Sequence, residues 1–312
     1  MTRWLAALFV LATLGAGVFY LLTWPEWMDA ADLPDHAPGP ANGERMFWAG
    51  GCGSCHAAPG AKGEAKRTLG GGLELKTPFG TFRAPNISPD PDAGIGGWSD
   101  LDFVNAMARG VSPDGAHYYP AFPYTNYQRM PIEDLIDLKA FLDHLPKSTN
   151  RVAGHDLDFP FNVRRGLGLW KRLYLDGAAM ALAATRAGAP DRGRYLVEGP
   201  GHCGACHTPR DRFGGEIAAR HLAGAAQFEG EVKPGAKPGR VPNITPHADG
   251  LGNWSEKDIA YALESGFDPD FDSFGGSMVS VQENMAQLSP EDRAAIAAYL
   301  KSVPPVASEK SP

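Results

Sequence analysis

The sequence is poor in cysteine, and its four cysteines all lie within two short segments, residues 50–60 and 201–210. It also lacks a glycine-rich nucleotide loop and a catalytic-triad pattern, so nothing in it resembles a common enzyme's substrate site. A net charge of −7 gives the chain no general affinity for nucleic acid. Strand signals are weak throughout, which predicts a mostly helical protein with many loops.

Charge is absent from residues 4–22, a run of 19. As a helix rising 1.5 Å per residue, this run spans roughly 28 Å, close to the ~30 Å of bilayer hydrocarbon. Arg3 precedes it and no lysine or arginine follows before Arg45, so the positive-inside rule places the N-terminus in the cytoplasm. A cleaved signal peptide is the alternative, but its apolar core is usually 7–15 residues. We expect an uncleaved anchor in a bacterial inner membrane, with the body in the periplasm.

The rest of the chain contains an internal repeat. "APNISPDPDAGIGGWSDLDFVNAMARG" matches "VPNITPHADGLGNWSEKDIAYALESG", and "MPIEDLIDLKAFLDHLP" matches "LSPEDRAAIAAYLKSVP". Self-similarity at a nearly constant offset indicates duplication with small insertions. The expected organisation is an anchor at 1–30, a first domain at 37–147, a linker at 148–189 and a second domain at 190–306.

Each repeat predicts the same helices. They are a short helix before the cysteines (41–48 and 192–198), a helix opened by an S-x-x-D start signal (Ser99 and Ser255), and a final helix (132–145 and 290–303). The linker contains "DFPFNVRRGLGLWKRLYL", which mixes aromatics with basic residues. We expect it to pack over its own domains, with contact to lipid head groups or a partner as the alternative.

Both cysteine segments contain the pattern C-x-x-C-H, in the sets Cys52, Cys55, His56 and Cys203, Cys206, His207. Two cysteines at this spacing add across the vinyl groups of a haem, and the adjacent histidine becomes the proximal iron ligand. A zinc site needs four N or S ligands, but it does not require a histidine directly after the second cysteine in each copy. Disulfide bonds would explain the cysteines but neither histidine. The sequence therefore predicts two covalently bound haem c groups.

With these two motifs, the chain resembles the membrane-bound cytochrome c subunits of periplasmic alcohol, gluconate and sorbitol dehydrogenases. The resemblance rests on "TPFGTFRAPNISPDPDAGIGGWS", "HYYPAFPYTNYQRM", "FPFNVRRGLGLW" and "GGSMVSVQENMAQLSPEDRAAIAAYLKSVP". Many members of that family carry three haems, whereas this chain has two motifs. The resemblance implies an all-α fold, with two tandem class I cytochrome c-like domains after an N-terminal transmembrane helix. In such domains a glycine of the first helix crosses an aromatic of the last, here Gly43 with Phe141 and Gly193 with Tyr299.

A closed electron-transfer haem needs a sixth ligand, which is usually methionine in this class. In the second domain we expect Met278, in the glycine-rich "GGSM" segment, with Met285 as the alternative. In the first domain we expect Met130, with Met107 and His117 as alternatives.

Two further pairs, Trp98 with Trp254 and Asn86 with Asn243, recur at equivalent places. They either wall the haems and bond their propionates, or define turns of the fold.

The resemblance implies electron transfer rather than catalysis. A periplasmic dehydrogenase catalytic subunit delivers electrons to one haem, and the other haem passes them toward the quinone pool or a terminal oxidase. The alternative is a di-haem enzyme of the thiosulfate dehydrogenase or peroxidase type. Thiosulfate dehydrogenases are known for a haem iron ligated by cysteine, whereas all four cysteines here serve attachment. A peroxidase needs a haem iron that can free a coordination position.

Overall fold

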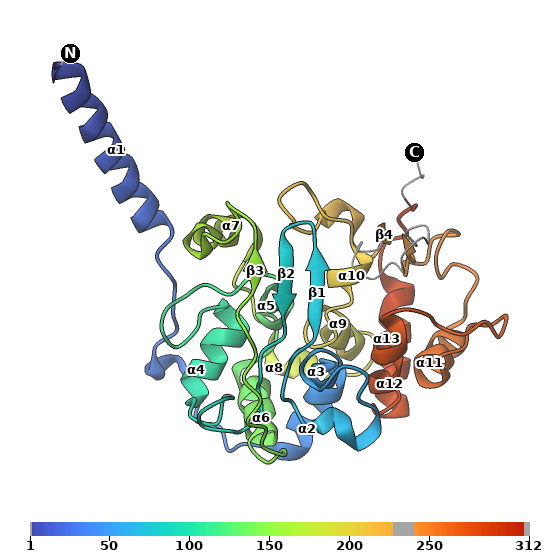
Figure 1. The fold of residues 1–312 in the computed structure, drawn as a ribbon. Coiled ribbons are helices and arrows are strands. Elements are labelled where there is room, and N and C mark those ends of the chain that lie inside the picture. The colour runs from blue at the N-terminus through green and yellow to red at the C-terminus, as the bar shows by residue number, and fades with distance from the viewer. Residues whose placement is uncertain (1, 227–239, 309–312) are drawn as a thin grey trace.

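The computed structural model describes residues 2–226 and 240–308. One long helix, α1 (Thr2–Leu22), extends away from a body built of short helices and loops (Figure 1). The stretch Arg3–Leu22 is long and apolar enough to cross a membrane, and none of it is buried against the body. By length and composition, α1 agrees with the expected anchor.

The first repeat folds around two crossing helices. Its elements are α2 (Pro40–Ala49), α3 (Cys52–His56), α4 (Asp100–Val104) with a π-helical turn (Asn105–Arg109), α5 (Tyr124–Tyr127) and α6 (Ile132–Leu142). Ser99 caps α4, because its side chain accepts from the Asp102 backbone N–H while the Asp102 carboxylate accepts from Ser99. This capping box confirms the start signal read in the sequence.

The second repeat forms the same set of helices. They are α9 (Asp191–Glu198), α10 (Gly204–His207), α11 (Glu256–Ser265), α12 (Met278–Met285) and α13 (Pro290–Ser302). Ser255 and Asp258 form the equivalent capping box at α11. The predicted helices before each motif and at each domain's end are all present.

Two glycines let the first and last helices of each domain cross at backbone contact. A Cβ on Gly43 of α2 would lie 2.0 Å from the carbonyl oxygen of Asp137 and 2.8 Å from the Cβ of Phe141. A Cβ on Gly193 of α9 would lie 1.8 Å from a carbonyl oxygen of α13 and 2.9 Å from the Cβ of Tyr299. All four distances are shorter than real Cβ contacts, so only glycine fits at the two positions. The expected crossing pairs are confirmed.

Two small sheets were not foreseen from the sequence. β1 (Glu74–Thr77), β2 (Gly80–Arg83) and β3 (Asp156–Leu157) form an antiparallel sheet in that order, and β4 (Ala225–Ala226) pairs with β5 (Arg240–Val241). The strands are two to four residues long and lack a clean alternation of buried and exposed side chains. β3 belongs to the linker, so the linker returns over the first domain to complete the sheet.

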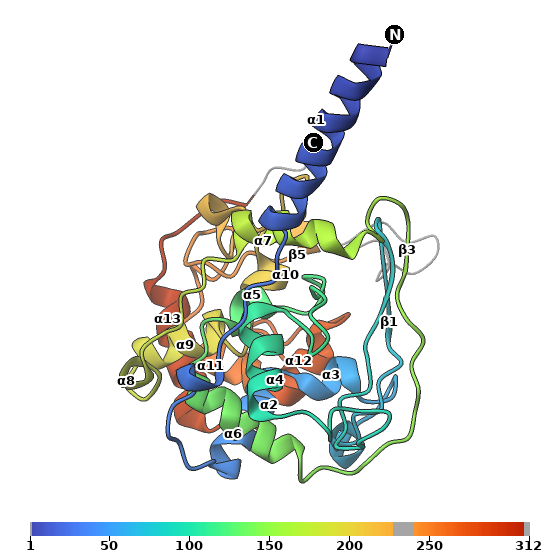
Figure 2. The same ribbon diagram turned by 90° about the vertical axis from the view of Figure 1, so that its left-hand side faces the viewer.

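The remainder of the linker carries α7 (Leu167–Tyr174) and α8 (Leu182–Thr185). α7 lies beside the body end of α1 (Figure 2). The Lys171 Nζ of α7 donates to the carbonyl oxygens of Arg109 and Gly110 at 2.7 and 2.6 Å. The linker thus packs on the first domain, as expected, although one side of α7 faces away from it.

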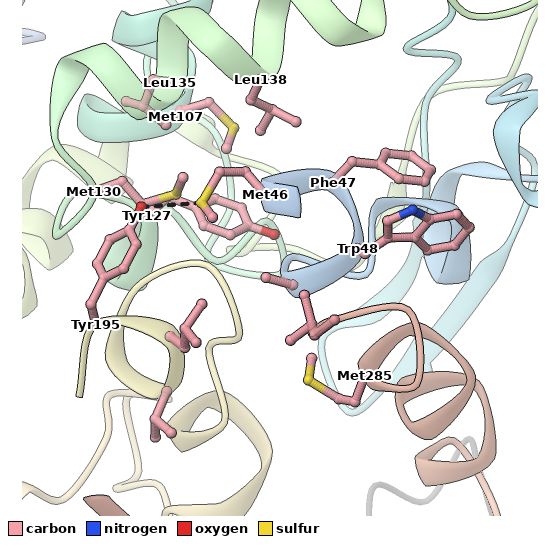
Figure 3. Packing of buried hydrophobic residues seen from close by; sticks show 14 of the residues in the cluster. Met46, Phe47, Trp48, Met107, Tyr127, Met130, Leu135, Leu138, Tyr195 and Met285 are labelled. Atoms are coloured by element: carbon pink, nitrogen blue, oxygen red, sulfur yellow. Dashed lines mark hydrogen bonds between the residues drawn. The ribbon is translucent and has the colours of Figure 1, made fainter. Parts of the chain in front are cut away.

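The two domains share one continuous apolar core (Figure 3). At its centre the Tyr195 hydroxyl of the second domain donates to the Asp134 carboxylate and lies 3.2 Å from the Met46 sulfur, both in the first domain. Elsewhere the buried Lys66 Nζ lies 2.7 Å from a Glu283 carboxylate oxygen of α12. These contacts fix how the two motif-bearing segments face each other.

Candidate functional site

The first C-x-x-C-H motif forms its own short helix. After α2 ends at Ala49, Gly51 takes a φ of +59° and turns the chain so that α3 begins at Cys52. A left-handed φ favours glycine, which has no Cβ to clash. In the second domain His202, with a φ of +37°, occupies the turn before Cys203. Each motif is thereby held at the end of its domain's glycine-containing crossing helix.

Each motif histidine is oriented by a proline carbonyl. The His56 Nδ1 lies 2.8 Å from the Pro85 oxygen, and the His207 Nδ1 lies 2.8 Å from the Pro242 oxygen. A carbonyl oxygen only accepts, so Nδ1 carries the proton and Nε2 keeps its lone pair. Burial lowers the pKa of both histidines, which favours the neutral ring. A neutral imidazole oriented through its other nitrogen is the usual form of a metal ligand.

The motif cysteines have raised pKa values. Burial raises the pKa of Cys52 and Cys203 to about 12. Desolvation by the surrounding protein, and then the charge of Cys206, raises the pKa of Cys55, whose side chain is exposed to solvent. In the described part of the chain, no three His, Cys, Asp or Glu side chains gather to hold a metal ion. A neutral, oriented histidine directly after the second cysteine of each motif fits covalent haem attachment.

The two motifs meet across the domain interface. His202, which precedes Cys203, donates from Nε2 to the carbonyl oxygen of Gly50 at 3.3 Å, two residues before Cys52. The His202 ring also packs edge-on against Tyr127, with ring centroids 5.7 Å apart. Sequence reasoning placed one motif in each domain and carried no signal that their approach segments touch.

The expected distal methionines occupy different settings. Met130 is 1 % exposed in the turn before α6 and packs in the core cluster that also contains Met46 and Met107 (Figure 3). Met278 is half-buried and begins α12, rather than lying within an irregular loop, and Met285 is buried at the other end of that helix. The assignment of Met278 ahead of Met285 stays a prediction.

The cytochrome c family model matches residues 40–146 and residues 191–304. The chain belongs to the cytochrome c family. Each match covers one repeat and one C-x-x-C-H motif, and the cytochrome carries two covalently bound haem c groups. The resemblance and the cofactor prediction are therefore confirmed.

Named relatives agree with this assignment. The cytochrome is 54 % identical over 266 residues to a diheme cytochrome c-type protein of Cereibacter sphaeroides, covering 85 % of this chain and 86 % of that protein. It is 35 % identical to the cytochrome c subunit of a quinone alcohol dehydrogenase of Gluconobacter oxydans, and 37 % identical to the gluconate 2-dehydrogenase cytochrome c subunit of Pantoea cypripedii. Those matches cover 86 % and 84 % of this chain but only 55 % and 58 % of the two subunits. The cytochrome is an electron-transfer protein rather than a catalytic enzyme.

The repeated asparagines stabilise turns. In the cytochrome, Asn86 Nδ2 donates to the Ser148 carbonyl oxygen at 2.7 Å, and Asn243 Nδ2 donates at 2.7 Å to a carbonyl oxygen beyond α13. Each therefore ties its proline-containing loop to the chain that follows its domain's last helix. Trp98 and Trp254 are half-buried and pack against the core. Of the two roles left open for the asparagines, the structure favours the turn.

His117, the histidine alternative for the first haem, contacts the junction between α1 and the body. His117 is buried, and its Nε2 donates to the Thr23 carbonyl oxygen at 2.9 Å, at the junction with α1. The other alternative, Met107, is buried in the π-helical turn as core. His117 contacts the junction, and both Met107 and Met130 lie in the core cluster, so Met130 stays the predicted ligand of the first domain.

Proposed function

We propose that this cytochrome is the electron-transfer subunit of a periplasmic dehydrogenase and passes electrons toward the quinone pool or a terminal oxidase. The observation that carries the proposal is the contact between the two motif-bearing segments at His202 and Gly50. Two carriers held against each other form a relay, whereas two independent carriers need no such contact. The names of the relatives, cytochrome subunits of alcohol and gluconate dehydrogenases, support a dehydrogenase as the donor.

The residues that hold the two groups follow from the motifs. The proposed attachment and proximal residues are Cys52, Cys55 and His56 for the first haem, and Cys203, Cys206 and His207 for the second. When bound, each haem supplies a one-electron centre whose potential depends on its axial ligands. Pro85 and Pro242 hold the proximal rings in the tautomer that presents Nε2. We assign Met130 and Met278 as the distal ligands.

The same proposal covers location and finer architecture. α1 crosses the bacterial inner membrane once and the body lies in the periplasm, because Arg3 precedes the apolar run and no basic residue follows it in sequence before Arg45. The two domains, at 37–147 and 190–306, are tandem class I cytochrome c domains joined by a linker at 148–189. The glycine crossings of α2 with α6 and of α9 with α13 support this class.

The test uses the native membrane. The full-length cytochrome, purified in mild detergent from its own membranes, is expected to retain a dehydrogenase catalytic subunit, identified by mass spectrometry. Adding that enzyme's fuel to intact membranes is expected to reduce both haems, seen as growth of the ferrous α-band. In membranes lacking this gene, fuel-dependent quinone reduction or oxygen uptake is expected to fall. If no dehydrogenase is retained and every fuel leaves both haems oxidised, the proposal is wrong.

A further inference from the structure

The junction between α1 and the body is built from arginine caps. The last carbonyl groups of a helix have no partners within it and carry its negative dipole end. In α1 these oxygens are met by two arginines of the linker: Arg165 Nη2 donates to the Tyr20 oxygen at 3.0 Å, and Arg172 Nε donates to the Leu22 oxygen at 2.6 Å. Arg165 Nε also donates to the Thr23 hydroxyl at 2.9 Å. The helix therefore ends on the protein rather than in solvent.

Thr23, the first residue after α1, is fully buried in the body. His117 donates to its carbonyl oxygen, and Gly168 of α7 packs so closely that a Cβ there would lie 2.6 Å from the Thr23 Cα. A flexible tether has no such contacts, so α1 leaves the body in a fixed direction. Figure 2 shows the chain of α7 and its preceding loop running across the side of the body from which α1 leaves.

α7 buries only part of its apolar surface, because Leu167, Trp170 and Tyr174 are half-buried whereas two leucines face outward. Gly168 and Lys171 face inward and are buried, while Leu169 and Leu173, one turn apart, are 40 % and 71 % exposed. Arg172 lies beside them on the outward side. Surface helices normally turn their apolar side chains to the core, so the outward leucines need another apolar environment.

Further apolar side chains extend this surface on both sides of α7. The preceding loop exposes Phe159 at 80 % and Phe161 at 44 %, and Phe213 at 57 % adjoins α7 because Trp170 Nε1 donates to its carbonyl oxygen at 2.9 Å. Trp24, immediately beyond α1, is 56 % exposed. We call this set the anchor-side face: Trp24, Phe159, Phe161, Leu169, Leu173, Phe213.

Arginines border the anchor-side face. The Arg165 guanidinium lies 4.3 Å from the Tyr20 ring centroid, and the Arg212 guanidinium lies 4.7 Å from that of Phe213. Arg172 reaches toward Glu26, 3.9 Å away, across the same junction. Aromatic and aliphatic side chains edged by arginine match the boundary between acyl chains and anionic head groups, where the apolar part is inserted and the cation meets phosphate.

We propose that the anchor-side face lies in the interfacial layer of the same phospholipid bilayer that α1 crosses, so that the body docks flat on the membrane. The proposal rests on α1 being transmembrane, because the arginine-capped junction is what brings this face to the lipid. The occupant is the bilayer itself: anionic head groups at the arginines and acyl chains at the leucines and phenylalanines. The docked face then fixes the orientation of both haem sites relative to the membrane.

The experiment uses full-length haem-loaded cytochrome in nanodiscs of anionic phospholipid doped with a phospholipid carrying a photoreactive diazirine near its head group. After irradiation, peptide mapping is expected to find lipid adducts on the α1 peptide and on the peptide covering 159–173, and none on α11. Replacing the anionic lipid by a zwitterionic one is expected to lower the yield on 159–173 severalfold. Adducts on α1 with none on 159–173 overturn the docking proposal alone. No adducts on α1 overturn the transmembrane assignment, and the docking proposal falls with it.

A matched pair of variants separates lipid contact from folding. Leu169→Asn with Leu173→Asn is expected to lower adducts on 159–173 severalfold while the α1 adducts and the haem absorption spectrum stay as in the wild type. Tyr261→Asn, an equally exposed apolar position on α11, is expected to change none of these. Adduct yields on 159–173 that are equal in both variants contradict insertion of the leucines.

Discussion

The imidazole of His202 donates to the carbonyl oxygen of Gly50 at 3.3 Å and so joins the two haem-attachment segments across the domain interface. The same ring packs on Tyr127, whose pKa is raised chiefly by burial. His202 therefore stands between the second motif and the immediate surroundings of the first.

His202→Asn tests this contact. Asparagine tolerates the left-handed backbone at this position but is too short to keep the bond and the ring packing. We expect a loss of about 1–2 kcal/mol in the free energy of unfolding, measured by guanidinium titration of the haem-loaded protein. Each motif keeps its own proline contact, so both haems should still attach. An unfolding midpoint equal to that of the wild type would show that the contact adds nothing to the interface.

Gly43→Ala and Gly193→Ala test the helix crossings. Each new methyl group meets a backbone carbonyl that has no room to move, so we expect losses at or above ~3 kcal/mol and little haem-loaded protein in the membrane. Gly154→Ala is the control, because nothing lies within 4 Å of a Cβ at that position; we expect a change within about 0.5 kcal/mol. Thermal melting and haem-stained gels measure both quantities. Normal yields for the two crossing variants contradict the close approach.

The ion pair of His221 and Glu198 is expected to make the stability of the second domain depend on pH. His221 Nε2 lies 2.7 Å from Glu198 Oε1, which also accepts from Tyr299. Burial lowers the pKa of His221, but the hydrogen bond and charge of Glu198 outweigh it, so the net pKa is raised. Burial likewise opposes ionisation of Glu198, but its partners lower its pKa overall.

The direction of the pH dependence follows from these two pKa shifts. The histidine contribution is complete below its unfolded pKa of ~6.5 and is lost as pH rises through the higher folded value. The glutamate contribution is present above ~4.3 and is lost as pH falls. We therefore expect His221→Gln to cost about 1 kcal/mol near pH 5.5 and less near pH 8.5. Equal costs at both pH values would rule out the charged pair.

Met130→Leu and Met278→Leu test the distal ligands. Leucine conserves volume, so the buried site of Met130 loses its sulfur with little packing change. We expect each variant to change the potential of one haem only, toward lower values, and to weaken the near-infrared charge-transfer band of methionine ligation in the ferric state. Met285→Leu, a buried position on α12, is the control and should leave both potentials unchanged. If Met130→Leu behaves like this control, Met130 is a core residue and the first haem has another distal ligand or none.

The parts of this cytochrome that sequence predicts are those set by local patterns. Ser99 and Ser255 mark helix starts because the capping box needs only four consecutive residues. Gly43 and Gly193 were identified through the family resemblance. The structure shows their role, because α6 and α13 pack directly against them and leave no room for a Cβ. The motif histidines were found by spacing, whereas their Pro85 and Pro242 partners lie some 30 residues away, within the repeated loop.

What sequence did not predict depends on long-range pairing. β1 and β2 are short and become a sheet with β3 of the linker, where Thr81 pairs with Asp156. The contact of His202 with Gly50 depends on how the two repeats pack against each other, which no periodicity encodes. The role of Asn86 was open because a buried amide serves a cofactor or a turn equally well until its partners are known. The distal ligands remain predictions.

The buried Thr23 junction has a consequence for how this cytochrome finds its partners. A body on a loose tether samples all orientations, so a productive encounter must match several angles at once. With α1 in a bilayer and its end clamped by Arg165, Arg172 and His117, the body keeps chiefly one rotation, about the membrane normal. The cytochrome and a membrane-bound donor or acceptor then search for each other in two dimensions of position and one angle. Most of the orientational entropy that association would cost is therefore already lost before the partners meet.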